Sequence, residues 1–183
     1  MQIATKTKPA RALLVSVEAA MLLLLTGWVG KAYVANALAS RPTVDNLERA
    51  VKLDPSNADY HMRLGRLYEY SLLDLQLEKA EGHFRRATHL DSYDPQTWLE
   101  LAAALELQGR IAEAGACLRQ VDLLAPNLPA YQWPIANFYL LQGSIDEAFQ
   151  HFRVVLAGTS QYNSNVFGLA WKATDDAGRF FSN

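Results

Sequence analysis

Three side chains of the kind that bind metal ions recur at one fixed interval. His83, Cys117 and His151 follow one another at spacings of 34 residues. A zinc ion holds imidazole and thiolate ligands about 2.0–2.3 Å away, so these residues could share an ion only if the fold brought them together. Whether that happens depends on the elements that carry them.

The rest of the sequence excludes several classes of function. It contains no Gly-rich phosphate loop, no nucleophile-elbow motif, and no pair of histidines at metal-ligand spacing on one helix. The 183 residues carry a formal net charge of -2, which gives no concentrated basic face for nucleic acid. The single cysteine cannot form an internal disulfide. We therefore expect no enzymatic activity, no cofactor and no nucleic-acid partner.

The segment from Trp98 to Phe152 repeats itself with the same period. Residues 108–114 read Gln-Gly-Arg-Ile-Ala-Glu-Ala, and residues 142–148 read Gln-Gly-Ser-Ile-Asp-Glu-Ala. Shortly after these stretches, Leu118 is matched by Phe152. A period of 34 residues is typical of proteins built from stacked repeats.

The motifs within each period resemble the tetratricopeptide repeat. That family has Trp-x-x-Leu-Gly-x-x-Tyr, then Ala-x-x-x-Phe, then Pro, spread over 34 residues. Three units match this pattern in consecutive phase, through His61, Leu64, Gly65, Tyr68, Ala80 and Phe84, then Trp98, Leu101, Ala102, Leu105, Ala114, Leu118 and Pro126, then Ile135, Ala136, Tyr139, Ala148 and Phe152. The first unit has His61 in the Trp position and about three extra residues between Ser71 and Leu77.

The resemblance implies that each unit is a pair of antiparallel helices stacked on the next. Small residues such as Gly65 would let the helices of a pair approach closely, and Gly109 and Gly143 would release the backbone at the turns. His83, Cys117 and His151 would then lie on the outer helices of successive pairs, too far apart to share one ion. We interpret them as ordinary surface or half-buried side chains and predict no metal site.

The resemblance also implies that the first helix of each pair lines a concave binding face. In phase with the motifs, nine residues are predicted to form a partner-binding groove: Met62, Arg66, Glu69, Leu99, Ala103, Glu106, Trp133, Asn137 and Leu140. Chaperone-binding members clamp a carboxylate with Lys and Asn along this face, whereas no Lys falls here, which disfavours such a partner. In the alternative interpretation the apolar members pack against a neighbouring helix or the terminal cap, and Arg66 and Glu69 are solvated surface charges.

The N-terminal segment is predicted to cross a membrane. Residues 1–11 are basic, and an apolar run extends from Ala12 to Val29, long enough at about 1.5 Å per residue to cross most of a hydrocarbon core of roughly 30 Å. We expect residues 12–38 to form a signal-anchor helix, within which Glu18 is a tolerated charge. The alternative is a signal peptide cleaved near Ala39, which would release a soluble secreted or periplasmic protein.

The remaining boundaries follow from changes of pattern. We expect a linker at residues 39–42, a repeat domain at 43–160 and a C-terminal helix, cap and tail at 161–183. The predicted fold is therefore all-α. It has a transmembrane helix followed by an α-solenoid of about three tetratricopeptide units, with a leading half unit and a C-terminal capping helix.

The resemblance implies a scaffold that holds other proteins together. We expect it to be anchored in a bacterial inner membrane through residues 12–38, with a cytoplasmic N-terminus and an extracytoplasmic repeat domain. Its groove would recruit partner proteins or peptides, in envelope, polysaccharide or secretion assembly. A different interpretation is a truncated or accessory repeat unit of an envelope enzyme complex whose catalytic part lies on another chain.

Overall fold

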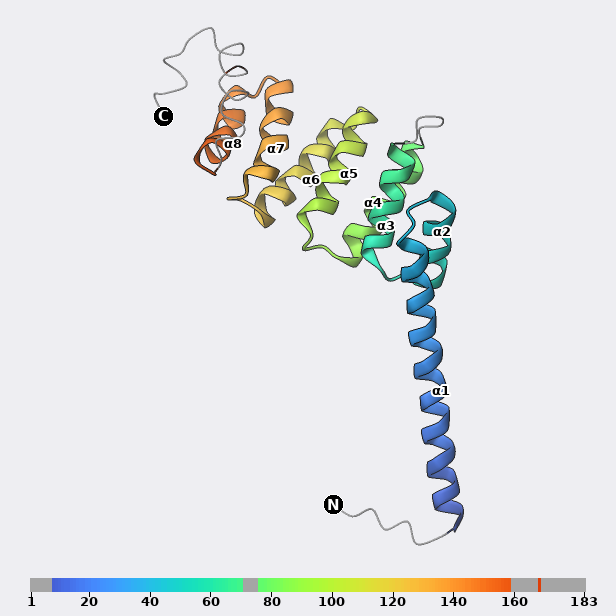
Figure 1. Ribbon diagram of the computed structural model, residues 1–183. Coiled ribbons are helices and arrows are strands. Elements are labelled where there is room, and N and C mark those ends of the chain that lie inside the picture. Colours follow the sequence, from blue (N-terminus) through green and yellow to red (C-terminus); the bar gives the residue numbers. More distant parts are fainter. Residues whose placement is uncertain (1–7, 71–75, 159–167, 169–183) are drawn as a thin grey trace, which may run out of the picture.

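The structure is a computed structural model that describes residues 8–70, 76–158 and 168. Within these ranges it is all-α, as predicted, and Figure 1 shows a curved row of short helices with one long helix projecting from its end. The helices are α1 (Lys8–Ala39), α2 (Val44–Leu53), α3 (Ala58–Glu69), α4 (Leu77–Leu90), α5 (Pro95–Leu107), α6 (Ile111–Leu124), α7 (Pro129–Leu141) and α8 (Ile145–Gly158).

The row is built from helix pairs. Helix α3 packs on α4, α5 on α6, and α7 on α8, and each pair contacts the next. This confirms the predicted solenoid of three helix pairs. Apart from Gly168, the capping helix predicted within residues 161–183 lies outside the described residues, and most of the insertion predicted between Ser71 and Leu77 does too.

Glycines act at the positions that the repeat pattern indicates. Gly109 and Gly143 connect the two helices of a pair with φ angles of 73° and 76°, in the left-handed region that favours glycine. Gly65 has another role, because a Cβ atom there would lie 2.7 Å from the ring of Phe84. The absence of a side chain thus permits α3 and α4 to pack closely.

The leading half unit is completed by the end of α1. Ala35 and Ala39 are fully buried and belong to the same hydrophobic core as Leu47 and Ala50 of α2. The guanidinium of Arg63 on α3 also donates to the backbone carbonyl of Ala39. The last turns of α1 therefore occupy the place of a first helix in the stack.

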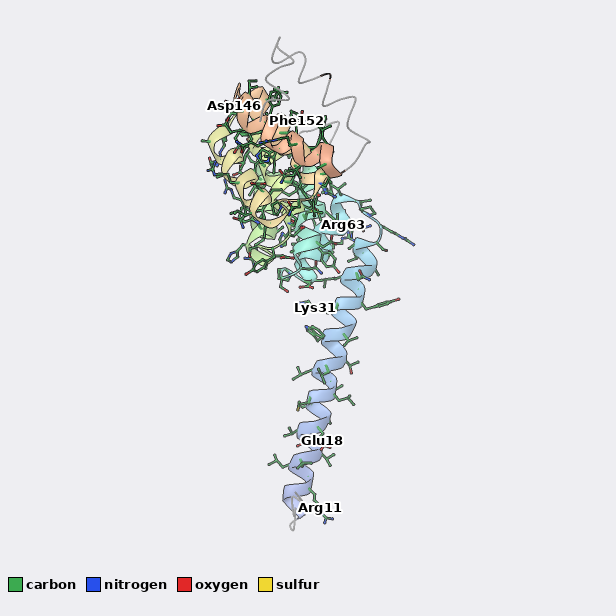
Figure 2. The ribbon with its side chains drawn as sticks, turned by 90° about the vertical axis from the view of Figure 1, so that its left-hand side faces the viewer. Arg11, Glu18, Lys31, Arg63, Asp146 and Phe152 are labelled. Atoms are coloured by element: carbon green, nitrogen blue, oxygen red, sulfur yellow. The ribbon has the colours of Figure 1, made fainter. Side chains whose placement is uncertain are left out.

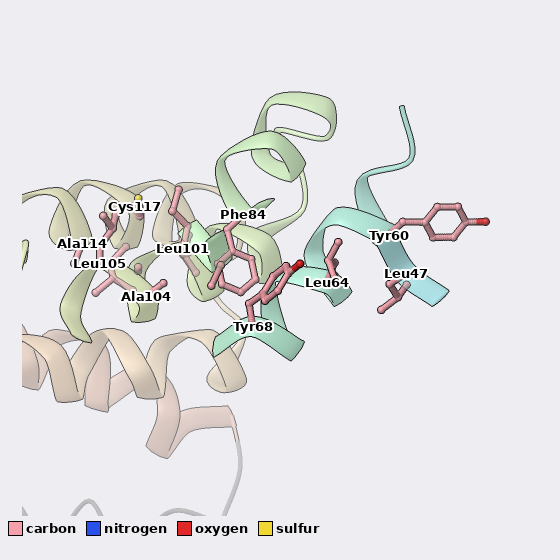
Figure 3. Close-up of a cluster of buried hydrophobic side chains, with 14 of the residues drawn as sticks. Leu47, Tyr60, Leu64, Tyr68, Phe84, Leu101, Ala104, Leu105, Ala114 and Cys117 are labelled. Carbon is pink, nitrogen blue, oxygen red and sulfur yellow. The ribbon is translucent and has the colours of Figure 1, made fainter. Parts of the chain in front are cut away.

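The buried residues form a core that continues through the pairs. Figure 3 shows part of it, from Leu47 and Leu64 past Phe84 to Leu105. A second cluster lies between α7 and α8 and includes Phe152. This core holds the first helices in a fixed register, so equivalent positions of successive units project from the same side.

Candidate partner-binding face

The first helices lie on the inner side of the bend. Helix α3 contacts α5, and α5 contacts α7, whereas direct contacts between the second helices α4, α6 and α8 are sparser. A row of helix pairs curves towards the side on which its helices approach more closely. The face formed by α3, α5 and α7 is called the inner face below.

Local sequence fixes where each of these helices begins. The side chain of Asn57 caps α3 by accepting a backbone hydrogen bond at 3.3 Å. Asp94 caps α5 through two such bonds, of 3.0 and 3.2 Å. Pro95 and Pro129 occupy the first positions of α5 and α7, where a proline is compatible with a helix. The three first helices therefore start at equivalent points of the repeat.

In the first unit, Arg66 joins two neighbouring repeats. Its Nε atom donates to Glu100 Oε1 on α5 at 2.9 Å, and its Nη2 atom donates to the same oxygen. Gln96 adds a third donor to that oxygen, at 2.7 Å. Arg66 is thus held in an ion pair across the inner face, which contradicts its interpretation as a solvated surface charge.

Glu69 is the most unusual residue of the predicted groove. Only 4% of its surface is exposed, so it is not a solvated surface charge either. Its Oε2 atom has no hydrogen-bond partner among the described residues. Burial, together with the nearby Glu100 carboxylate, raises the pKa of Glu69 to about 7, against the opposing charge of Arg66. The inner face thus contains a buried carboxyl that is readily protonated near neutral pH.

The other predicted groove residues, among them Met62 in the first unit, are half-buried, and some of them also pack on the core. Leu99 packs against the main hydrophobic core, while Ala103 and Glu106 follow it along α5. On α7, Trp133 packs edge-on against the ring of Phe152, with ring centres 5.7 Å apart, and Leu140 joins the same cluster. Asn137 directs its amide to the Trp133 carbonyl at 2.9 Å. The apolar members therefore contact the neighbouring core, while their role in binding a partner stays a prediction.

The two histidines of the 34-residue series face inward, each towards the first helix of its own pair. His83 Nδ1 lies 3.0 Å from His61 Nδ1, and His61 Nε2 lies 3.3 Å from the Pro55 carbonyl. Because a carbonyl can only accept, His61 donates from Nε2. Burial lowers the pKa of both histidines and so favours neutral rings, and a neutral His61 then accepts at Nδ1 from His83. His151 Nδ1 similarly lies 2.5 Å from an amide oxygen on α7.

The remaining member of the series, Cys117, is buried in the main core, so its interpretation as a surface or half-buried side chain is wrong. Among the described residues, no group of three or more His, Cys, Asp or Glu side chains could hold a metal ion.

Comparisons with known proteins identify the architecture. No family model and no curated protein matches the chain. Among solved structures, it superposes on YrrB with a TM-score of 0.63 at 18% identity, covering 83% of this chain and 80% of that one. YrrB is described as a TPR protein, a tetratricopeptide-repeat protein, with an unusual peptide-binding site. This chain has the tetratricopeptide-repeat fold.

Two further structures agree with that assignment. A thermophilic TPR protein of Thermus thermophilus, TTC0263, gives a TM-score of 0.60 at 20% identity, covering 78% of this chain and 79% of that one. MamA gives 0.63 at 17% identity, covering 76% and 82%. At these identities the likeness establishes the fold alone.

Some residues of the inner face were not predicted from the sequence. Glu100 was not among the predicted groove residues, although it binds Arg66. Three large apolar side chains at the ends of the first helices were also missed: Tyr70, Leu107 and Leu141, which are 68%, 61% and 75% exposed. Each directly follows a predicted groove residue, so a repeated apolar residue one position further along was the signal that could have revealed them.

Proposed function

We propose that this chain is a membrane-anchored scaffold whose inner face binds a segment of a partner protein. The observation that best supports the anchor is the exposure of α1. Figure 2 shows it standing clear of the repeats from Arg11 past Glu18, and its leucines and valines are largely exposed. An apolar surface of this extent requires a cover, and α1 is long and apolar enough to cross a bilayer.

The length of α1 fits an anchor that also positions the repeats. Its 32 residues extend for about 48 Å, more than the roughly 30 Å of a hydrocarbon core. With residues 12–29 in the bilayer, the last ten residues would rise about 15 Å above it and end in the packed half unit. The basic residues before Ala12 favour a cytoplasmic N-terminus, which would put the repeats on the other side.

Burial of the end of α1 argues against release by cleavage near Ala39. Cleavage there would remove Ala35 and Ala39 from the core of the half unit and take away the carbonyl that Arg63 binds. Core side chains of α2 would then be exposed to water. The uncleaved form is therefore the better-supported alternative.

The experiment that tests the anchor is protease protection in spheroplasts of a bacterial host. A tag placed before Lys6 should survive added protease, while the repeat domain should be digested. Loss of the tag together with protection of the repeats would contradict the proposed orientation. Recovery of the full chain from the aqueous fraction, without detergent, would contradict the anchor itself.

The experiment that tests the inner face is a crosslinking pull-down from intact membranes. Trp133→Ala combined with Leu99→Ala should abolish recovery of the partner, because both half-buried side chains are predicted to line that face. Leu123→Ala is the matched control, since Leu123 is 76% exposed on the second helix α6. Equal recovery with all three proteins would exclude the inner face. Envelope, polysaccharide and secretion assemblies are where we propose that the partner be sought.

A further inference from the structure

Acidic groups are in excess on the inner face. Helices α5 and α7 contain no lysine or arginine, and the only charged residues of α5 are Glu100 and Glu106. The two arginines of α3 are already engaged, Arg63 with Asp59 and a backbone carbonyl, and Arg66 with Glu100. Among the described residues, Glu69 and Glu106 have no ion-pair partner.

These two glutamates occupy equivalent positions that do not favour the helix. Glu69 is the last residue of α3, and Glu106 is the last but one of α5. The carboxyl end of a helix carries partial negative charge, so an acid there is destabilising while a cation there is stabilising. The Oε2 atom of Glu69 is also buried without a partner among the described residues. A positive group brought to these helix ends from outside the chain would offset the negative charge at both and supply a partner for Glu69.

Exposed apolar side chains accompany the acids. Tyr70 directly follows Glu69, Leu107 directly follows Glu106, and Leu141 occupies the equivalent position at the end of α7. Burial and, after it, the Glu69 and Glu100 carboxylates raise the pKa of the Tyr70 hydroxyl. The first two helices of the inner face thus end in an acid followed by an exposed apolar residue, and α7 ends in Leu140 and Leu141; these three helix ends form one edge of the inner face.

We propose that this edge binds a partner segment in which basic residues alternate with apolar ones. The basic side chains pair with Glu69 and Glu106, and the apolar ones cover Tyr70, Leu107 and Leu141. Packed helices lie about 8–10 Å apart, and an extended chain advances about 3.3 Å per residue, so the basic residues recur at about every third position. This inference rests on the proposed scaffold function and specifies the chemistry of its partner.

The test uses the full chain in a nonionic detergent and labelled peptides of about twelve residues, with affinity measured by fluorescence anisotropy. One peptide repeats Lys-Leu-Ser, a second repeats Glu-Leu-Ser, and a third repeats Lys-Ser-Ser. The first should bind at least about tenfold more tightly than either other peptide, because only it satisfies both the charges and the apolar groups. Equal affinity for the Lys-Leu-Ser and Glu-Leu-Ser peptides would overturn the proposal.

Variants identify the residues responsible. Glu69→Gln should weaken binding of the Lys-Leu-Ser peptide about tenfold, whereas Glu147→Gln, on the exposed side of α8, should leave it unchanged. Binding to the unaltered chain should also be tighter at about pH 8 than at pH 5.5, since Glu69 attracts a lysine only after it has lost its proton. The charged and titratable groups that act on Glu69 are Arg66 and Tyr70 at the end of α3 and Glu100 on α5. Undiminished binding by Glu69→Gln would overturn the assignment.

The two proposals fail in distinguishable ways. If the Trp133 and Leu99 double variant loses its partner in the pull-down while the peptides show no preference for lysine, the scaffold function stands and the basic segment is wrong. If the pull-down is unaffected by that double variant, the proposed function itself fails, whatever the peptides do.

Discussion

Glu69→Gln is expected to stabilise the folded chain at alkaline pH. The pKa of Glu69 is raised from the ordinary 4.5 to about 7, chiefly by burial. One pKa unit corresponds to about 1.4 kcal/mol, so an ionised Glu69 costs the folded state up to about 3 kcal/mol. Glutamine resembles the protonated side chain and avoids this cost. The variant should therefore unfold with a free energy up to about 3 kcal/mol higher at pH 8.

The sign of the pH dependence follows from which state binds the proton more tightly. The folded state holds the Glu69 proton more firmly, so the stability that this residue contributes is full below about pH 4.5. It is lost progressively as the pH rises through about 7. The difference between variant and unaltered chain should accordingly be small near pH 4.5 and reach its maximum above pH 7. Subtracting the two profiles removes the contribution of the histidines, which titrate in both proteins.

The assay is urea unfolding of the full chain in a nonionic detergent, followed by circular dichroism at several pH values. Glu147→Gln is the control, because it makes the same change at an exposed position and should alter the free energy of unfolding by less than about 0.5 kcal/mol. A difference between Glu69→Gln and the unaltered chain that stays constant from pH 5 to pH 8 would refute the reasoning.

Four further predictions concern the packing of the helix pairs. Gly65→Ala should lower the free energy of unfolding by about 1–3 kcal/mol, since its Cβ would lie 2.7 Å from the Phe84 ring. A Cβ atom at Gly82 would meet nothing within 4 Å, so Gly82→Ala should raise the free energy of unfolding by about 0.5–1 kcal/mol. Urea unfolding that ranks Gly65→Ala as the more stable of the two variants would contradict both predictions. Burial and a neighbouring histidine lower the pKa of His83. The stability that His83 contributes is therefore full above about pH 6.5 and is lost as the pH falls. A titration followed by nuclear magnetic resonance checks this, and a midpoint at or above about 6.5 would contradict it. Cys117 is 6% exposed, and burial raises the pKa of its thiol. It should therefore react with a thiol reagent on the order of 100-fold more slowly than in the unfolded chain. Equal reaction rates in the two states would disprove its burial.

The repeat architecture could be predicted because its signals are local and recur. A glycine in a turn and a small residue opposite a large one each have a direct steric meaning, and the structure gives Gly109, Gly143 and Gly65 these roles. The same period explains why His83, Cys117 and His151 are equally spaced although each contacts different neighbours. They occupy the same place on three successive second helices.

The chemistry of the inner face could not be predicted from the same signals. Arg66 and Glu100 lie 34 residues apart on different helices, and their pairing depends on how far α5 is offset against α3. The burial of Glu69 depends on the same packing. Tyr70, Leu107 and Leu141 were missed for another reason, because each lies one position beyond a predicted groove residue and its exposure depends on where its helix ends.

The junction between α1 and the repeats determines how the inner face would meet a partner. A flexible linker would let the repeat domain sample many orientations above the membrane. Here α1 continues without a break to Ala39 and is packed into the core of the half unit, so the repeats are fixed relative to the helix axis. If α1 crosses the bilayer, the inner face is presented in one orientation to partners that share the membrane. Confinement with a partner also raises their effective concentration, so a short basic and apolar segment would need only modest intrinsic affinity to stay bound.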